Sequence, residues 1–216
     1  MNKVVKLLIL SDFAIFSAAG IAAPVFAIFV TKQIIGGTLE IVGIASSIYL
    51  FFRAILQLGF AKWIDRKTNE KYDFSLLISG SILISIVPLG YLFVHLPFEI
   101  YILEALSGLG FSMTLPAWYA IFTRHIDKGR EGFEWSASDT SIAMGQALAA
   151  FLGGFLAEKY GFHWVFIAMS ALSILGAIFL TVIFRDLKTQ KIVITQKSGE
   201  ELLQPLKKRL KYKRIY

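Results

Sequence analysis

Six stretches of the chain are apolar and long enough to cross a lipid bilayer, and this feature constrains the fold most. A helix needs about 20 apolar residues to cross roughly 30 Å of hydrocarbon. Lipid offers no hydrogen-bond partners, so each crossing segment must satisfy its own backbone groups, as a helix does. The predicted spans are residues 7–31, 41–61, 74–96, 99–123, 140–157 and 162–184. We therefore predict an all-α membrane protein with six transmembrane helices.

The loops between these spans carry the basic residues on alternate sides. Of the 22 Lys and Arg residues, all but Lys32, Arg53 and Lys159 fall before span 1, after spans 2 and 4, or after span 6. Basic residues concentrate on the cytoplasmic side of membrane proteins. The pattern predicts a multi-pass protein of the plasma (inner) membrane with both termini in the cytoplasm.

Composition excludes several other classes of protein. A mean hydropathy of +0.65 leaves no polar face for nucleic acid, although the net charge is +7. The chain has no cysteine, which excludes disulfides and thiolate-bound metal. The three His residues fall in loops or at span ends, and there is no serine-nucleophile, zinc-protease or nucleotide-binding motif. We therefore expect no enzyme, no cofactor and no metal site.

The N-terminus imitates a signal peptide, with basic residues before an apolar run and small residues before Pro24. A signal-peptide core is only about 7–15 residues long, whereas this run is longer and five more spans follow it. We expect the first span to be retained.

The chain is predicted to have two parts, a transmembrane domain over residues 1–185 and a basic cytoplasmic tail over residues 186–216. Two interpretations of the basic cluster at residues 206–214 stay open. It binds anionic lipid headgroups, at about 1 kcal/mol per charge, or it is solvated and only enforces the topology.

The sequence matches itself at an offset of 92 residues. The matched pairs are Asp12 and Glu104, Pro24 and Pro116, and Lys32 and Arg124. Span 1 runs outward and span 4 inward, so the two halves would have inverted topology. Proline-interrupted helices at matching positions of inverted repeats point to a transport site.

The order of motifs along residues 5–184 resembles the N-terminal half of the major facilitator superfamily. Span 1 has the glycine-then-proline pattern of that family, ending at Pro24. The loop after span 2 places Asp65 and Arg66 at the acid and base of the pattern G-x-x-x-D-R/K-x-G-R-R/K. Span 4 matches R-x-x-x-G-x-G from residue 104, with Glu104 in place of the arginine. Span 5 ends close to the antiporter pattern G-P-x-x-G-G, but it lacks the Gly-Pro pair.

This resemblance implies half of a transporter bundle, built from two three-helix inverted repeats. It implies a secondary transporter that moves a small-molecule substrate by alternating access, with ion coupling. The missing Gly-Pro pair and arginine argue against a drug–proton antiporter of the usual kind. Members of the family generally have two six-helix halves, so self-association as a homodimer, a separate second half, or a fragment are all open. A membrane scaffold or sensor that does not transport is the alternative function.

Three ionisable residues fall well inside the predicted spans, namely Asp12, Arg53 and Glu104. A charge at that depth costs about 2.5–3.5 kcal/mol, so each should face protein or water. We predict that Asp12 pairs with Arg53, either lining the cytoplasmic part of a cavity or only fixing the packing of two helices. Glu104 has no basic residue at its depth. It is therefore the best candidate for reversible protonation, or else a neutral carboxyl hydrogen-bonded to a neighbouring helix.

The turn that holds Asp65 and Arg66 is predicted by the resemblance to be a gating loop, with Glu134 and Asp139 as partners for Arg66. The alternative is a solvated turn that only contributes positive charge.

A possible substrate cavity is predicted around the two repeat-related prolines. Its candidate residues are Pro24, Phe26, Gln57, Pro116, Trp118, Tyr119 and Gln146. Aromatic ring faces can contact an apolar or cationic substrate. The alternative is that these rings serve packing or face lipid.

Overall fold

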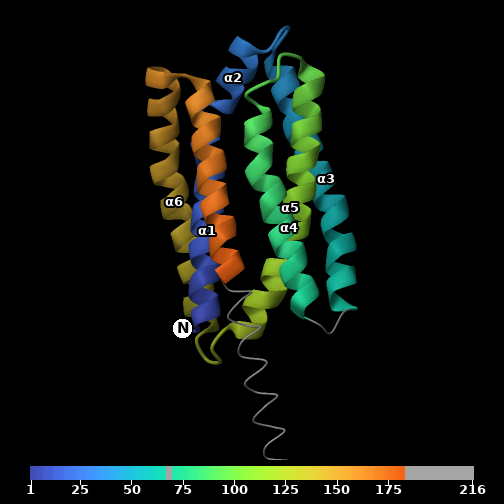
Figure 1. Cartoon of the computed structure of the whole chain (residues 1–216), viewed down its shortest axis with the longest axis vertical. Coiled ribbons are helices and arrows are strands. Elements are labelled where there is room, and N and C mark those ends of the chain that lie inside the picture. Colours follow the sequence, from blue (N-terminus) through green and yellow to red (C-terminus); the bar gives the residue numbers. More distant parts are fainter. Residues whose placement is uncertain (67–69, 183–216) are drawn as a thin grey trace, which may run out of the picture. The chain divides into compact units, whose positions relative to one another are not determined.

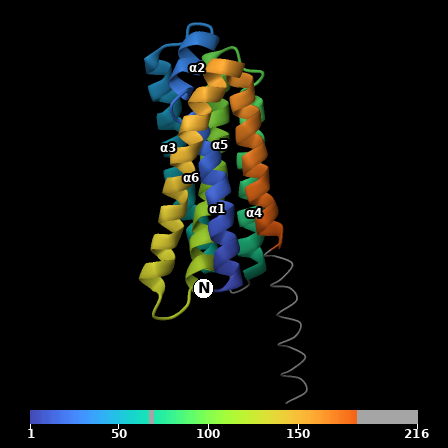
Figure 2. The same cartoon turned by 90° about the vertical axis from the view of Figure 1, so that its left-hand side faces the viewer.

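The computed structural model describes residues 1–66 and 70–182, and within them it contains seven helices (Figures 1 and 2). They are α1 (Lys3–Ala22), α2 (Phe26–Gln33), α3 (Leu39–Asp65), α4 (Glu70–Gly90), α5 (Pro97–His125), α6 (Glu131–Tyr160) and a last helix, Phe162–Val182. Six of them are long and apolar enough to cross a membrane, which confirms the predicted all-α fold. The predicted tail, residues 186–216, lies outside the described residues.

Two ends of the helix bundle Met1–Thr181 serve as reference points below. We call the end that holds Met1, Asp65 and Arg124 the basal end, which is the end predicted to face the cytoplasm. The opposite end, which holds α2 and Gly161, is the distal end (Figure 1).

The first predicted span is broken, because α1 stops at Ala22 and α2 starts at Phe26. Pro24 lies in the break, where it has no N–H to continue the helical hydrogen bonds, and its side chain is exposed. Its repeat partner Pro116 is buried inside α5, which stays continuous. Surrounding packing therefore decides which of the two prolines interrupts its helix.

Two other helix boundaries differ from the prediction. α4 ends at Gly90, six residues before the predicted end of span 3, and three turn-type hydrogen bonds follow, the first from Tyr91 N–H to the Pro88 carbonyl. α6 begins at Glu131, nine residues before the predicted start of span 5. Glu131 and Glu134 lie in its first turn, where the helix dipole favours negative charge.

The helix boundaries themselves repeat at the offset of 92 residues. Adding 92 to the bounds of α4 gives 162–182, the bounds of the last helix, and adding it to the start of α3 gives 131, the start of α6. The end of α2 maps in the same way onto the end of α5. The three residue pairs that match in the sequence are therefore part of a repeat that extends through the described bundle.

Helices that pack closely on each other come from different repeats. α1 packs against α6, and α5 packs against α3 and α4. Close approach relies on glycine: a Cβ on Gly153 of α6 would collide with the Ile21 carbonyl oxygen of α1. A Cβ on Gly108 of α5 would lie 2.6 Å from the Tyr49 carbonyl oxygen of α3. Small residues at such contacts are how helices approach closely in lipid.

Candidate functional site

Glu104 is held by a hydrogen bond at the distal half of α5. The hydroxyl of Tyr91, one residue after α4, donates to Glu104 Oε1 at 2.8 Å. Tyr91 is buried and Glu104 is half-buried. No basic residue in the described part of the chain forms a salt bridge with Glu104. The role of Glu104 as a reversibly protonated group stays a prediction.

The predicted pairing of Asp12 with Arg53 is not formed among the described residues. Arg53 Nη1 instead donates to the hydroxyl of Tyr49, one turn away on α3, at 3.3 Å. Asp12 is 7% exposed and makes neither a salt bridge nor a hydrogen bond within residues 1–66 and 70–182. The physical reason is the helix arrangement, in which α1 packs on α6 while α3 packs on α5.

The predicted gating residues lie at the basal end of α3. Asp65 is its last residue, Arg66 follows it, and both are exposed; residues 67–69 of the motif lie outside the described residues. The predicted partners of Arg66 are placed elsewhere. Glu134 is fully buried and accepts a hydrogen bond from the Asp127 N–H, while Asp139 is exposed on α6.

A charged cluster at the basal end was missed by the sequence analysis. Asp73 near the start of α4 is fully buried, and its carboxylate accepts a charged hydrogen bond from Arg124 near the end of α5. Glu70 approaches both Arg124, at 3.8 Å, and His125 Nδ1, at 3.5 Å. An acid at the start of one span and a base at the end of the next was the available signal, because antiparallel neighbours bring these ends together. We call this set of four residues the basal clamp.

A second charged cluster joins the loop before α6 and the first turn of that helix to the N-terminus. The N-terminal ammonium of Met1 is 2.7 Å from Asp127 Oδ2 and 3.8 Å from Glu134 Oε1. The hydrogen bond from this ammonium, more than its charge, holds the pKa of Asp127 below its ordinary value of 3.8. The start of α6 is thereby tied to the start of α1.

The predicted substrate-cavity residues do not share one cavity. Phe26 opens α2 at the distal end, whereas Trp118 and Tyr119 lie two turns from the basal end of α5. Phe26 and Trp118 are 92 residues apart, so they occupy the same position in two repeats of opposite direction. Inverted repeats place such a pair at opposite ends of the bundle, and this explains the separation.

The basal aromatic residues form a cluster of their own. Trp118 stacks on Phe122 with ring centroids 4.5 Å apart, and Trp135 of α6 packs against both rings. The indole N–H of Trp118 is buried and has no hydrogen-bond partner within the described residues. Tyr119 is 43% exposed and contacts the edge of the same cluster.

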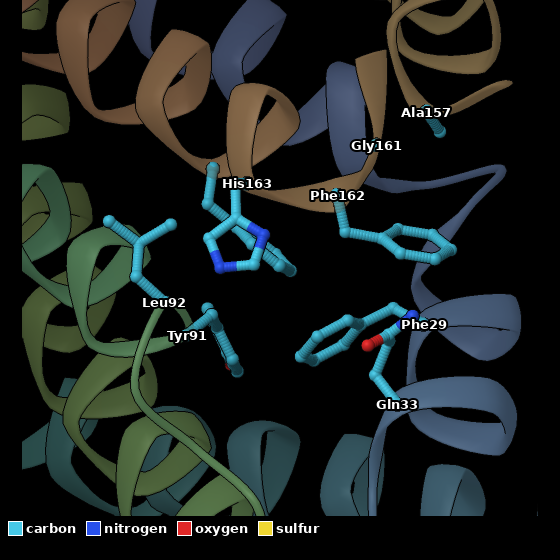
Figure 3. Close-up of a pocket in the computed structure, with 9 residues that line it drawn as sticks. Phe29, Gln33, Tyr91, Leu92, Ala157, Gly161, Phe162 and His163 are labelled. Atoms are coloured by element: carbon cyan, nitrogen blue, oxygen red, sulfur yellow. The ribbon is translucent and has the colours of Figure 1, made fainter. Parts of the chain in front are cut away.

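A cavity of about 400 Å³ lies at the distal end (Figure 3). Its lining residues are Phe29, Gln33, Tyr91, Leu92, Ala157, Gly161, Phe162, His163 and Phe166. They come from α2, the segment after α4, the end of α6 and the start of the last helix. Gly161, at a φ of 88°, lets the chain turn from α6 into the last helix within one residue. None of the predicted cavity residues lines this space, although Phe26 packs edge-on against Tyr91.

Two helices are left largely uncovered, and their exposed faces are partly polar. In the 18-residue apolar stretch of each helix, 6% of the residues of α3 and 17% of those of α6 are buried, against 61% for α1. The exposed positions include Ser46 on α3 and Gln146 on α6, and Gln57 of α3 is half-buried. The exposed middle positions of α4 and the last helix are mostly aliphatic, such as Ile82 and Ile174, and Ser79 of α4 is the exception.

These features are typical of a membrane protein with ionisable groups inside its spanning helices. Two carboxyls, Asp12 and Glu104, lie inside helices that are long enough to span the bilayer. Within residues 1–66 and 70–182, no three His, Asp or Glu side chains are grouped so as to hold a metal ion.

Comparison with known proteins agrees with this arrangement. The family model of the Major Facilitator Superfamily matches residues 8–216. The chain is 23% identical over 178 residues to an uncharacterized MFS-type transporter of Methanocaldococcus jannaschii, a match that covers 82% of this chain and 45% of that protein. The fold is similar to the crystal structure of the POT family transporter PepTSo, with a TM-score of 0.66 and 14% identity.

The structural match covers 84% of this chain and 37% of PepTSo. The chain therefore spans less than half the length of the proteins it matches. The family model extends over nearly all of the chain and agrees with the six spanning helices. This multi-pass membrane protein belongs to the Major Facilitator Superfamily.

Proposed function

We propose that the chain is one half of a secondary transporter that is completed by a second copy of itself. It moves a small solute across the plasma membrane by alternating access, with both termini in the cytoplasm. The observation that carries this proposal is the uncovered, partly polar pair of faces on α3 and α6. Serine and glutamine side chains are costly in hydrocarbon, so these faces suit a partner or a water-filled cleft better than lipid.

Two-fold symmetry makes this arrangement self-complementary. A surface that contains both α3 and α6 can place α3 of one copy against α6 of the other, and the reverse contact then forms automatically. The aliphatic faces of α4 and the last helix stay toward lipid. Pro24, Gln57 and Gln146, which are exposed or half-buried, would then belong to a cleft between two copies.

Cysteine crosslinking tests the assembly cleanly, because the native chain has no cysteine. Phe51 of α3 and Leu148 of α6 are 64% and 63% exposed, and each lies twelve residues from the distal end of its helix. The double variant Phe51→Cys/Leu148→Cys should give a covalent dimer with a short bismaleimide in native-like membranes. The matched control is Ile82→Cys/Ile174→Cys on the aliphatic faces, which should stay monomeric. Equal crosslinking of both pairs, or of neither, would contradict a self-associated transporter.

Ion coupling is proposed to involve Glu104, whose only hydrogen-bond partner in the described chain is the neutral hydroxyl of Tyr91. Protonation of this carboxyl would remove a charge that the bundle does not otherwise neutralise. Proteoliposomes with a trapped pH dye should show proton uptake evoked by one member of a panel of sugars, amino acids, carboxylates and organic cations. Glu104→Gln should abolish this signal, whereas Glu158→Gln, at the exposed distal end of α6, should retain it. Full retention by Glu104→Gln would remove Glu104 from the mechanism.

A further inference from the structure

The distal cavity lies outside the α3 and α6 faces that carry the transport proposal, and it shares with that proposal only Tyr91, the partner of Glu104. We propose that it is a binding site for a small organic ammonium ion that enters from the distal side. The site is separate from the α3 and α6 faces, since its lining comes from α2, the segment after α4, the end of α6 and the last helix. Binding to the cavity is measured without transport, so its failure would leave the transport proposal standing.

Aromatic rings form much of the wall. Phe29 lies edge-to-face with Phe166 at 4.8 Å between centroids, and Tyr91 stacks on Phe166 at 5.0 Å. Phe162 is 5.6 Å from Phe29. Phe29, Tyr91 and Phe166 are buried and cover part of one another's rings, whereas Phe162 is half-buried. Figure 3 shows Phe29, Tyr91 and Phe162 gathered around the cavity. Cations bind ring faces within about 6 Å of the centroid.

The residues that line the cavity favour a cation over an anion. The Tyr91 hydroxyl donates a hydrogen bond to Glu104, which places a carboxyl, negative when it is ionised, behind one wall. None of the nine lining residues is Lys or Arg. Gln33 and His163 are exposed and supply hydrogen-bonding groups where the cavity meets solvent. A volume of about 400 Å³ lies within the usual size of small-molecule sites, about 300–1,000 Å³.

The same end of the bundle already holds an ammonium group over rings. Lys159 Nζ lies 5.4 Å from the ring centroid of Phe155 and 5.6 Å from that of Tyr160. These rings lie outside the cavity lining.

The test compares choline with 3,3-dimethyl-1-butanol, in which an uncharged carbon replaces the quaternary nitrogen. Purified protein in maltoside micelles, which contain no choline, is titrated and followed by saturation-transfer NMR. Choline should bind at least about fivefold more tightly than its isostere, since cation–π attraction supplies that much. Equal binding of the two probes, or no binding of choline, would overturn the proposal.

Ring removal locates the binding. Phe166→Leu keeps an apolar side chain but removes a ring face, and it should weaken choline binding about fivefold or more. The matched control is Phe93→Leu, which removes a ring that is 74% exposed and outside the cavity lining. Unchanged affinity in Phe166→Leu would place the bound choline elsewhere and overturn the site.

Substitutions of opposite charge at the cavity mouth give a second test, because Phe166→Leu could lose binding through a folding defect. Gln33→Lys should weaken choline binding and Gln33→Glu should strengthen it, each about threefold, because the exposed side chain is partly screened by salt. Opposite shifts from one exposed position are not produced by unfolding. The same affinity in both variants would contradict a cation in this cavity.

Free solute and lipid headgroup are two sources of the same quaternary ammonium group. Nanodiscs of phosphatidylglycerol, with and without phosphatidylcholine, distinguish them. Loss of choline binding only when phosphatidylcholine is present assigns the cavity to a headgroup, and retained binding assigns it to a free solute.

Discussion

Asp12 and Glu104 occupy the same position in the two repeats, yet their surroundings differ. Glu104 accepts a hydrogen bond from Tyr91, whereas Asp12 is more deeply buried and has no partner in the described chain. The residue 92 positions after Tyr91 is Ile183, which has no hydroxyl to offer and lies outside the described residues. The two repeats thus share a backbone plan but differ in side-chain chemistry.

The basal clamp shows the same asymmetry. Arg124 and Asp73 pair across α5 and α4. Their repeat counterparts at the distal end are Lys32 and Val165, which cannot form an ion pair. The basal clamp therefore joins two helices at one end of the bundle, and an aromatic cavity occupies the other end. Such an asymmetry gives the two sides of a membrane different chemistry.

The largest expected effect comes from breaking the clamp. Arg124→Met leaves the fully buried Asp73 without its charged partner, and breaking such a pair costs about 3–5 kcal/mol. Arg124 is itself 42% exposed, so we expect the lower end of that range. Denaturant unfolding in micelles measures the loss.

The second substitution makes the clamp resemble the other repeat. Adding Asp73→Val, the residue found at position 165, should recover most of the lost stability, because no buried charge remains. A double variant as unstable as Arg124→Met would show that the buried carboxylate is not the cause.

A smaller effect is expected where α1 and α6 touch. Gly153→Ala introduces the residue found at the matching position Ala61, but its Cβ would collide with the Ile21 carbonyl. Separating the helices should cost about 1–3 kcal/mol of unfolding free energy. The neighbouring Gly154→Ala faces open space and should be neutral or slightly stabilising. Equal losses in the two variants would argue against the close α1–α6 contact.

The smallest effects concern the two carboxyls, and they should have opposite signs. Tyr91→Phe leaves Glu104 without its hydrogen bond and should lower the unfolding free energy by about 1 kcal/mol. Asp12→Leu removes a buried polar group that has no partner and should raise it by about 1 kcal/mol. Thermal unfolding in micelles measures both. A loss of stability in Asp12→Leu would mean that Asp12 has a stabilising partner.

Hydrophobic length and the repeated positions of Pro24 and Pro116 were enough to predict the number of membrane-spanning helices and the inverted repeat. The break at Pro24 and the continuity at Pro116 were not predictable, because the exposure of Pro24 and the burial of Pro116 follow from the packing of the bundle. The expected Asp12–Arg53 pair failed for a related reason. Depth was estimated from helical rise, but depth does not tell which helices are neighbours.

The sequence by itself determined six membrane-length helices, their alternating directions and the family pattern, since these follow from local apolar length and from charge beside each span. Only the tertiary structure decided which side chains meet. Asp73 reaches Arg124, Tyr91 reaches Glu104, and four rings gather at the distal cavity. Each of these contacts joins different helices, and helix neighbours are set by close packing at residues such as Gly153, which local sequence does not encode.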